Sequence, residues 1–377
     1  MLNQQNVLRR FYRYIWVVPL AAGVLGGFVV NSNYYLGIAT TAMCFAVFGM
    51  SWYLQGGLAG QISLGNALFV AIGSYVPLIL FTHDHLTPVL GMFTSVAISV
   101  AVAALIGTIT LRLRGPYFGL ATLSVTAVAL EVTEHFQGLT GGANGLAVPA
   151  TGGAVDLQFS SNRWYYLMSL GVLAFVTVVV AVLRQTRLGY YLRIIRASEE
   201  AAAAAGVHVA RVWVVTYCIS AALTSIGGVV YVYYLTFADP SYLLGLTLSI
   251  DIALVVVIGG MNNLAGPIVG AIVFEVVTAA ANAYGGSSGG WDVLVVGIVV
   301  VLVVMVEPRG LVMLPVRLRS VLRSRTGSAN SKRRLRRRIE ERSDEPNPIL
   351  HMVEGRPDDS STRASTGVES VWRGPRP

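Results

Sequence analysis

Long apolar runs separated by short polar breaks dominate the chain up to about residue 306. No Asp, Glu, Lys or Arg occurs from residue 14 to residue 83, a stretch of 70 residues. A helix needs about 20 apolar residues to cross a bilayer, so this stretch alone can hold three spans. The whole pattern predicts about ten transmembrane helices, within a range of eight to eleven. They lie at 15–30, 36–54, 63–81, 88–110, 117–134, 164–183, 212–237, 243–259, 264–284 and 292–306.

Composition favours the same class. Hydrophobic residues make up 54% of the 377 positions and charged residues only 12%, which is typical of membrane proteins and not of soluble globules. The two cysteines, Cys44 and Cys218, lie in apolar segments without metal-ligand spacing, so we interpret them as small buried residues. The five histidines lack the spacing of a metalloprotease site. The sequence therefore predicts an all-α polytopic membrane protein with no metal site.

The distribution of positive charge predicts the orientation. If the N-terminus is cytoplasmic and ten spans alternate, 26 of the 27 Lys and Arg residues fall on the inside, and only Arg163 falls outside. Cytoplasmic loops carry such an excess of positive charge, so we expect both termini to be cytoplasmic.

Three regions follow from this topology. They are an N-terminal cytoplasmic segment at 1–14, a transmembrane domain at 15–314 with an inner loop at 184–211, and a tail at 315–377. The tail is basic and poor in apolar residues, a composition that predicts disorder. The net charge of +8 reflects mostly this tail and the topology, so we expect no nucleic-acid partner.

The inner loop contains a charged, alanine-rich stretch, RIIRASEEAAAAAGVHVARV (193–212). Ser198 can cap a helix, and Glu199 and Glu200 then fall in its first turn, where negative charge suits the helix dipole. Ala201 to Ala205 favour helix, and Gly206 can end it in a left-handed conformation. The expected helix is roughly 10 Å long at about 1.5 Å per residue, too short to span a membrane. It is either an interfacial connector or a docking element for a cytoplasmic partner.

The chain lacks the residues of an ATPase. A nucleotide-binding P-loop needs Gly-Lys followed by Ser or Thr, because the lysine must reach the phosphates. The only lysine is Lys332, which stands between Ser331 and Arg333. We find no enzyme motif elsewhere and expect no cofactor. If ATP drives this protein, partner subunits bind it.

A few polar residues interrupt the apolar spans and are candidates for lining a translocation path. A charged group at the bilayer centre costs about 2.5–3.5 kcal/mol on insertion scales, so Asp251 should face a polar interior or a partner. It serves either a substrate path or a hydrogen-bonded contact between helices, and both alternatives stay open. For the other candidates, packing and turn roles also stay open. The full set is Gln61, Ser63, Asn66, Thr140, Asn144 and Asp251.

Four stretches of the chain resemble one known family. They are GLAGQISLGNALFVAIGSY (57–75), LRLRGPYFGLATLSVTAV (111–128) with LTGGANGL (139–146), TRLGYYLRIIRASEEAAAAAGVHV (186–209), and SIDIALVVVIGGMNNLAGPIVGA (249–271). The terminal EPRGLV (307–312) fits as well. Together they resemble the permease subunit of branched-chain amino-acid ABC importers, in the M-type branch.

The resemblance implies an importer of the bacterial plasma membrane. Its partners would be a second permease, expected to form a heterodimer with this chain, two cytoplasmic ATP-binding subunits and an external substrate-binding protein. The family's inner loop docks into the ATPase. By position, that role falls to five residues: Glu199, Glu200, Ala201, Ala202 and Gly206.

The substrate implied by the resemblance is a branched-chain or related amino acid. The family often has an acidic and a basic residue in the fifth span, where this chain has Ala127 and Leu130. Urea and short amides therefore remain alternative substrates. A different class of protein, an ion-coupled secondary transporter, remains the alternative mechanism.

Overall fold

The computed structural model describes residues 32–110, 115–150, 153, 156–159, 161–285, 291–306 and 310–313. All of these residues belong to one compact unit, Met1–Val316, and a second unit, Arg317–Pro377, lies outside the described residues. The predicted N-terminal segment 1–14, the predicted first span 15–30, the tail 315–377 and Lys332 therefore fall outside the description.

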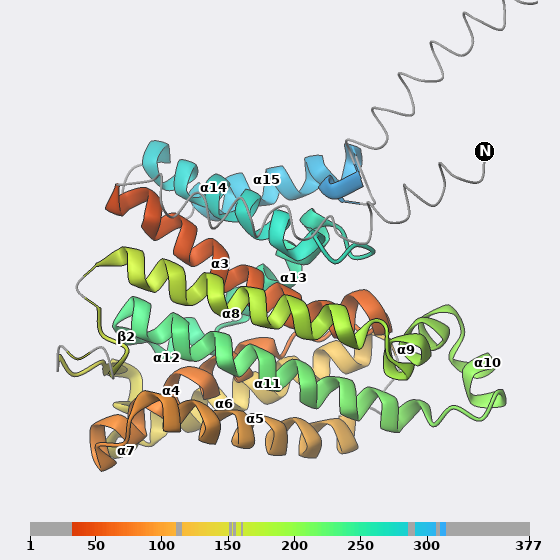
Figure 1. Cartoon of the computed structure of the whole chain (residues 1–377), viewed down its shortest axis with the longest axis horizontal. Coiled ribbons are helices and arrows are strands. Elements are labelled where there is room, and N and C mark those ends of the chain that lie inside the picture. The colour runs from red at the N-terminus through yellow and green to blue at the C-terminus, as the bar shows by residue number, and fades with distance from the viewer. Residues whose placement is uncertain are drawn as a thin grey trace, which may run out of the picture. The chain divides into compact units, whose positions relative to one another are not determined.

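Seven helices among the described residues are long and apolar enough to cross a membrane. They are α3 (Asn33–Tyr53) continued by η1 (Leu54–Ala59), α4 (Asn66–Asp84), α5 (Pro88–Thr110), α6 (Pro116–His135), α8 (Asn162–Leu183), α11 (Val209–Leu235) and α14 (Gly266–Gly285). Two shorter apolar helices, α13 (Leu246–Gly259) and α15 (Trp291–Val306), complete the set (Figure 1). The predicted class, an all-α polytopic membrane protein, is confirmed.

Each predicted span within the described residues coincides with a helix, because a long apolar run has few other ways to satisfy its backbone in lipid. The main difference concerns the predicted span 243–259. Helix α13 has 14 residues there, or roughly 21 Å, which is less than the roughly 30 Å of a hydrocarbon core. It begins after Gly245 and ends at Gly260, whose φ of 116° no other residue type adopts readily.

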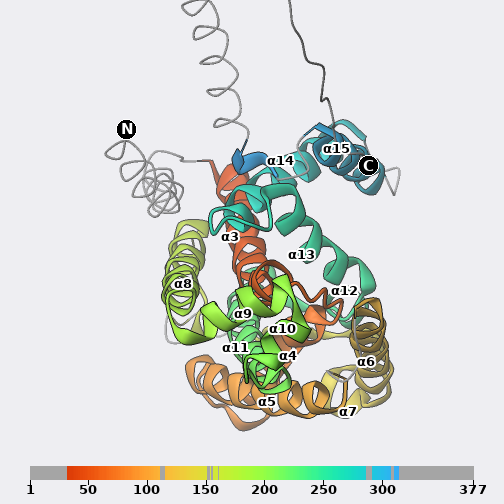
Figure 2. The same cartoon turned by 90° about the vertical axis from the view of Figure 1, so that its right-hand side faces the viewer.

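Helices α3 and α11 form the interior of the bundle. Helix α3 packs against α8, α11, α13 and α14, and α11 packs against α3, α4, α5 and α8. Figure 2 shows α5, α6, α8, α13 and α14 arranged around them. Aromatic side chains fill the space where α3, α11 and α14 meet, with edge-to-face contacts of Tyr231 with Phe45 and Phe48. Aromatic rings therefore pack the junction of these three helices.

The peripheral helices carry large exposed apolar side chains. Leu105 on α5, Val128 on α6 and Phe175 on α8 are 63%, 62% and 54% exposed. A soluble protein rarely leaves a continuous surface of this kind uncovered, whereas lipid tails solvate it at no cost. This surface agrees with a multi-pass membrane location.

Helices α4 and α11 cross at a point where their backbones touch. A Cβ atom on Gly73 would lie 2.2 Å from the carbonyl oxygen of Ser225, and one on Gly228 would lie 2.4 Å from that of Val70. Ser74 Oγ donates a hydrogen bond to the Gly228 carbonyl oxygen at 3.1 Å. Small residues at such crossings allow the close packing that holds membrane helices together.

The loops gather at two opposite ends of the bundle. At one end lie α7 (Gln137–Thr140), η2 (Gly142–Asn144), α12 (Pro240–Leu243) and a small antiparallel ladder of β1 (Leu146–Ala147) with β2 (Phe237–Ala238). At the other end lie α9 (Arg187–Ala197) and α10 (Glu199–Ala204) (Figure 1). Loops predicted outside thus meet one another at the first end. This ladder contains the only β-strands among the described elements. It joins the loop after α6 to the end of α11 by backbone pairing.

Candidate functional site

Helix α10 has the local structure that the sequence predicts. Ser198 Oγ accepts a hydrogen bond from the Ala201 backbone N–H at 3.2 Å, and Glu199 and Glu200 occupy the first turn. At the other end, Gly206 has φ 84° and donates its N–H to the Ala203 carbonyl oxygen at 3.0 Å. The predicted cap, helix and glycine stop are confirmed, and the docking role remains a prediction.

The five predicted coupling residues do not all face the same way. Glu200, Ala201 and Gly206 are exposed, and Glu199 is half-buried. Ala202 is fully buried, so its side chain anchors α10 to the rest of the protein. The face available to a partner therefore consists of Glu200, Ala201 and the neighbouring exposed alanines.

Helix α9 connects α10 to the membrane domain. It is amphipathic, with Leu192 and Ile195 buried. Near its end, the guanidinium of Arg196 donates a hydrogen bond to the carbonyl oxygen of Gly57. A Cβ atom on Gly60 would lie 3.0 Å from Arg196 Cγ, so the arginine stem rests directly on that glycine. Helix α9 is thus held against the inner end of α3.

The contact point of Arg196 is an irregular turn. Helix α3 ends in the π-helix η1, a widened turn that is frequent at functional sites. Cβ atoms on Gly56 and Gly57 would lie 2.1 and 2.2 Å from ring atoms of Trp52 and Tyr53, so this turn has no room for larger residues. The turn leads into a non-helical segment, residues 60–65, that precedes α4.

This segment and the first residue of α4 contain three of the predicted path residues, Gln61, Ser63 and Asn66, and several helices meet here. The Trp52 indole donates to the Ser63 carbonyl oxygen at 2.8 Å, and the Leu64 N–H donates to Thr122 Oγ1 at 3.1 Å. The Ala67 N–H donates to Ser249 Oγ at 3.3 Å. Helices α3, α4, α6 and α13 therefore meet around Ser63 and the start of α4.

Unpartnered amide groups lie at this break. Gln55 and Asn66 are 3% and 0% exposed, and neither amide atom of either side chain has a hydrogen-bond partner in the described part of the chain. Gln61 Nε2 is also buried without one. Each unpaired buried polar group costs about 1–3 kcal/mol of stability. These amides can therefore gain hydrogen bonds from a polar ligand that enters the break in another conformation of the permease. Gln55 and the hydroxyls of Thr122 and Ser249 were not among the predicted path residues, although each is polar within an apolar span.

The other predicted path residues lie elsewhere. Thr140 Oγ1 lies 2.5 Å from the Thr133 carbonyl oxygen and accepts from the Gly142 N–H at 3.2 Å, so it organises a turn at the outer end. Asn144 is exposed in η2. The structure therefore does not bring the six predicted residues into one cluster.

Asp251 lies neither at the break at residues 60–65 nor in the turn around Thr140. It stands two residues after Ser249 on α13, and such positions do not share a helix face. It interacts electrostatically with Tyr242 on α12, whose hydroxyl lies 2.9 Å from that of Tyr231. Burial raises the pKa of the Tyr242 phenol above its usual value; the hydrogen bond with Tyr231 lowers this pKa, and the negative charge of Asp251 raises it. Tyr242 is therefore a neutral hydroxyl beside this acid.

Comparison with known proteins gives the family. Residues 34–304 match the model of the branched-chain amino acid transport system / permease component family. The chain belongs to this family. It is the permease subunit of an ABC importer and a multi-pass membrane protein, as the resemblance predicts.

Relatives of this chain are named for different transported substrates. The chain is 27% identical over 322 residues to the high-affinity branched-chain amino acid transport system permease protein LivM of Escherichia coli K12, covering 78% of this chain and 73% of that one. Identity to LivM of Salmonella typhimurium LT2 is 26% over 301 residues. It is also 23% identical over 262 residues to the ribose import permease protein RbsC of Escherichia coli K12, covering 65% and 78% of the two chains. No solved structure matches the chain.

Proposed function

We propose that this permease subunit moves branched-chain amino acids and that separate subunits bind and hydrolyse the ATP. The longer match to the LivM proteins than to the ribose permease supports this substrate class. The proposed assembly contains a second permease, two cytoplasmic ATP-binding subunits and an external substrate-binding protein. This chain would have no catalysis of its own, since its sequence contains no P-loop lysine.

The observation that carries the proposal is the continuous connection from α10 to the polar break. An ATP-binding subunit docks on the exposed face of α10. Movement of α10 is passed to α9, and the hydrogen bond from Arg196 to Gly57 passes it to η1. The segment 60–65 follows η1 directly, so displacement of η1 repositions Gln61, Ser63 and Asn66.

The polar break suits the chemistry of an amino-acid substrate. An amide group both donates and accepts hydrogen bonds, so Gln55 and Asn66 can pair with a carboxylate or with an ammonium group. The apolar side chain of the substrate meets the apolar walls of the neighbouring helices. The unsatisfied amides become satisfied when substrate passes, which favours the open state only while substrate is present.

Reconstitution of the assembly in proteoliposomes tests the proposal. Uptake of radiolabelled leucine is expected only when ATP, the ATP-binding subunits, the second permease and the binding protein are all present. Uptake by this chain alone under a proton or sodium gradient would show an ion-coupled secondary transporter instead. Competition by unlabelled urea, acetamide or ribose, but not by isoleucine or valine, would overturn the substrate class.

A further inference from the structure

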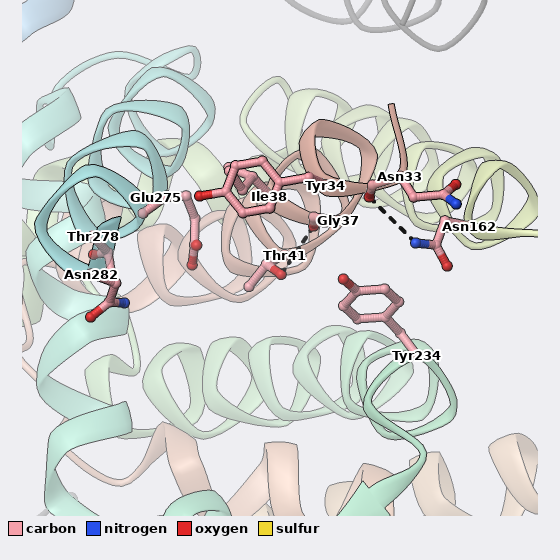
Figure 3. Close-up of a pocket in the computed structure, with 11 residues that line it drawn as sticks. Asn33, Tyr34, Gly37, Ile38, Thr41, Asn162, Tyr234, Glu275, Thr278 and Asn282 are labelled. Carbon is pink, nitrogen blue, oxygen red and sulfur yellow. Dashed lines mark hydrogen bonds between the residues drawn. The ribbon is translucent and has the colours of Figure 1, made fainter. Parts of the chain in front are cut away.

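A polar pocket lies between α3, α8, α11 and α14, on the side of the bundle away from η1. Its volume is about 450 Å³. Its lining includes one carboxylate, that of Glu275, together with amides and hydroxyls and no Lys or Arg. Figure 3 shows Glu275, Thr41 and Tyr234 directed toward the same space. The residues that line it are Asn33, Tyr34, Gly37, Ile38, Thr41, Asn162, Tyr234, Glu275, Thr278, Ala279 and Asn282.

The pocket lies toward the outer end of the membrane domain. Asn33 and Asn162 are the first residues of α3 and α8, and Tyr234 is next to the last residue of α11. The predicted topology places these helix ends on the outer side. The pocket is therefore separate from the break at residues 60–65 and from the docking helix.

Glu275 is the unusual member of this pocket. Its side chain is 9% exposed, no hydrogen bond or ion pair joins its carboxylate to another described residue, and the charged group that acts on it is a second carboxylate, that of Asp251. A buried carboxylate without a partner is costly, so such groups normally pair with a cation or a hydrogen-bond donor. The neighbouring Thr278 hydroxyl donates to the Phe274 carbonyl oxygen at 2.9 Å and is already engaged.

The chemistry of the lining restricts the ligand. A ligand whose only charged group is a phosphate or a carboxylate would meet the negative charge of Glu275 with no Lys or Arg in the lining to offset it, whereas a ligand that also carries a cation can place that cation on Glu275. A divalent metal ion is disfavoured, because no group of three His, Cys, Asp or Glu side chains gathers among the described residues. The volume also exceeds what a single ion needs. An organic cation with N–H donors fits, since the hydroxyls of Thr41 and Tyr234 and the amide of Asn282 offer oxygen acceptors around the carboxylate.

Room for the ligand depends partly on Gly37. A Cβ atom there would lie 3.1 Å from the Tyr234 hydroxyl oxygen, so glycine lets the phenol approach α3. Thr41 Oγ1 donates to the Gly37 carbonyl oxygen at 3.2 Å, and the Thr41 side chain also hydrogen-bonds with Tyr234, so these two hydroxyls lie together in the wall of the pocket. The Tyr34 ring adds an aromatic face, on which a cation binds favourably.

We propose that this pocket binds a primary ammonium group, with Glu275 as its counter-ion. The ammonium group belongs either to a free amino acid or to the headgroup of phosphatidylethanolamine. In both cases three N–H donors reach Glu275 and the surrounding hydroxyl and amide oxygens. The proposal does not depend on the substrate proposed above, because the pocket lies outside the polar break.

Binding to the purified full-length chain tests this proposal. Native mass spectrometry would measure binding of phosphatidylethanolamine, phosphatidylcholine and phosphatidylglycerol, and equilibrium dialysis would measure binding of leucine. Phosphatidylcholine carries a quaternary ammonium without N–H donors, and phosphatidylglycerol carries no ammonium. Preferential binding of phosphatidylethanolamine identifies the lipid as the source, and saturable binding of leucine identifies the free amino acid.

Three variants locate the binding. Glu275→Gln keeps the size of the side chain and removes its charge, and it is expected to weaken binding of the preferred ligand at least tenfold. Tyr234→Phe removes one hydroxyl and is expected to weaken it several-fold, which keeps the proposal testable if the first variant does not fold. Glu131→Gln, an exposed carboxyl on α6, is the matched control and should leave binding unchanged. Equal binding of all three lipids with no leucine binding, or binding unaffected by Glu275→Gln and Tyr234→Phe, would overturn the proposal.

Discussion

The guanidinium of Arg196 on α9 donates a hydrogen bond to the carbonyl oxygen of Gly57 in η1, 139 positions earlier in the chain. A positive charge suits this place, because the carbonyl groups at the end of a helix carry partial negative charge. The same side chain packs on Gly60, which ends η1 with φ 74°. One residue thus connects the helix pair α9–α10 to the turn that precedes the polar break.

Charge reversal on α10 is expected to weaken docking of the ATP-binding subunit. Glu199→Arg and Glu200→Arg both place positive charge at a helix N-terminus, and Glu200 lies on the exposed face that a partner would contact, so both variants should reduce co-purification of that subunit at least tenfold. Membrane insertion should be unchanged. Glu131→Arg, the same charge change on α6, is the control. Undiminished co-purification in both α10 variants would contradict the docking role.

Replacing the unpaired amides should lower transport without lowering the stability of the protein. Asn66→Leu and Gln55→Leu replace buried side chains that have no described partner, so the melting temperature of the purified protein should stay level or rise. ATP-dependent uptake should fall at least tenfold, because the polar break loses its hydrogen-bonding groups. Ser99→Ala, which removes a buried unpartnered hydroxyl on α5, should leave uptake intact. A lower melting temperature with normal uptake would show that the amides are structural.

The crossing of α4 and α11 should not tolerate a methyl group. In Gly228→Ala the new Cβ would lie 2.4 Å from the Val70 carbonyl oxygen, so the helices must move apart at a cost of about 1–3 kcal/mol. Thermal unfolding in detergent should show a clear loss of stability. Gly171→Ala on α8, where a Cβ would have no heavy atom within 4 Å, is the control and should be neutral or slightly stabilising. Equal melting temperatures of the two variants would contradict this packing.

The features that the sequence predicts are those encoded locally. Apolar runs indicate the spans between 36 and 306, and Ser198 and Gly206 mark the two ends of α10, because caps and spans depend on neighbouring residues. Contacts between distant segments could not be predicted in this way. The hydrogen bond from Arg196 to Gly57 and the ladder of β1 with β2 follow from how helices pack, and no local pattern encodes them.

In the candidate site, too, single residues could be predicted from the sequence but their arrangement in space could not. Gln61, Ser63 and Asn66 could be selected as polar residues in an apolar context, and they do lie at one break. Thr140 and Asp251 met the same criterion, but tertiary structure places them in separate locations. Glu275 is an acidic residue within the predicted span 264–284, whereas the pocket around it depends on residues from four helices.

The central claim is that α9 and α10 transmit the energy of ATP hydrolysis to the polar break through Arg196. Leucine uptake and ATP hydrolysis, measured together in the reconstituted assembly, give the number of molecules moved per ATP. Arg196→Gln is expected to keep ATP hydrolysis and lower this ratio at least tenfold. Arg193→Gln should leave it unchanged, because Arg193 bonds only to the Gly189 and Arg184 carbonyl oxygens among the described residues. An unchanged ratio in Arg196→Gln would contradict the account.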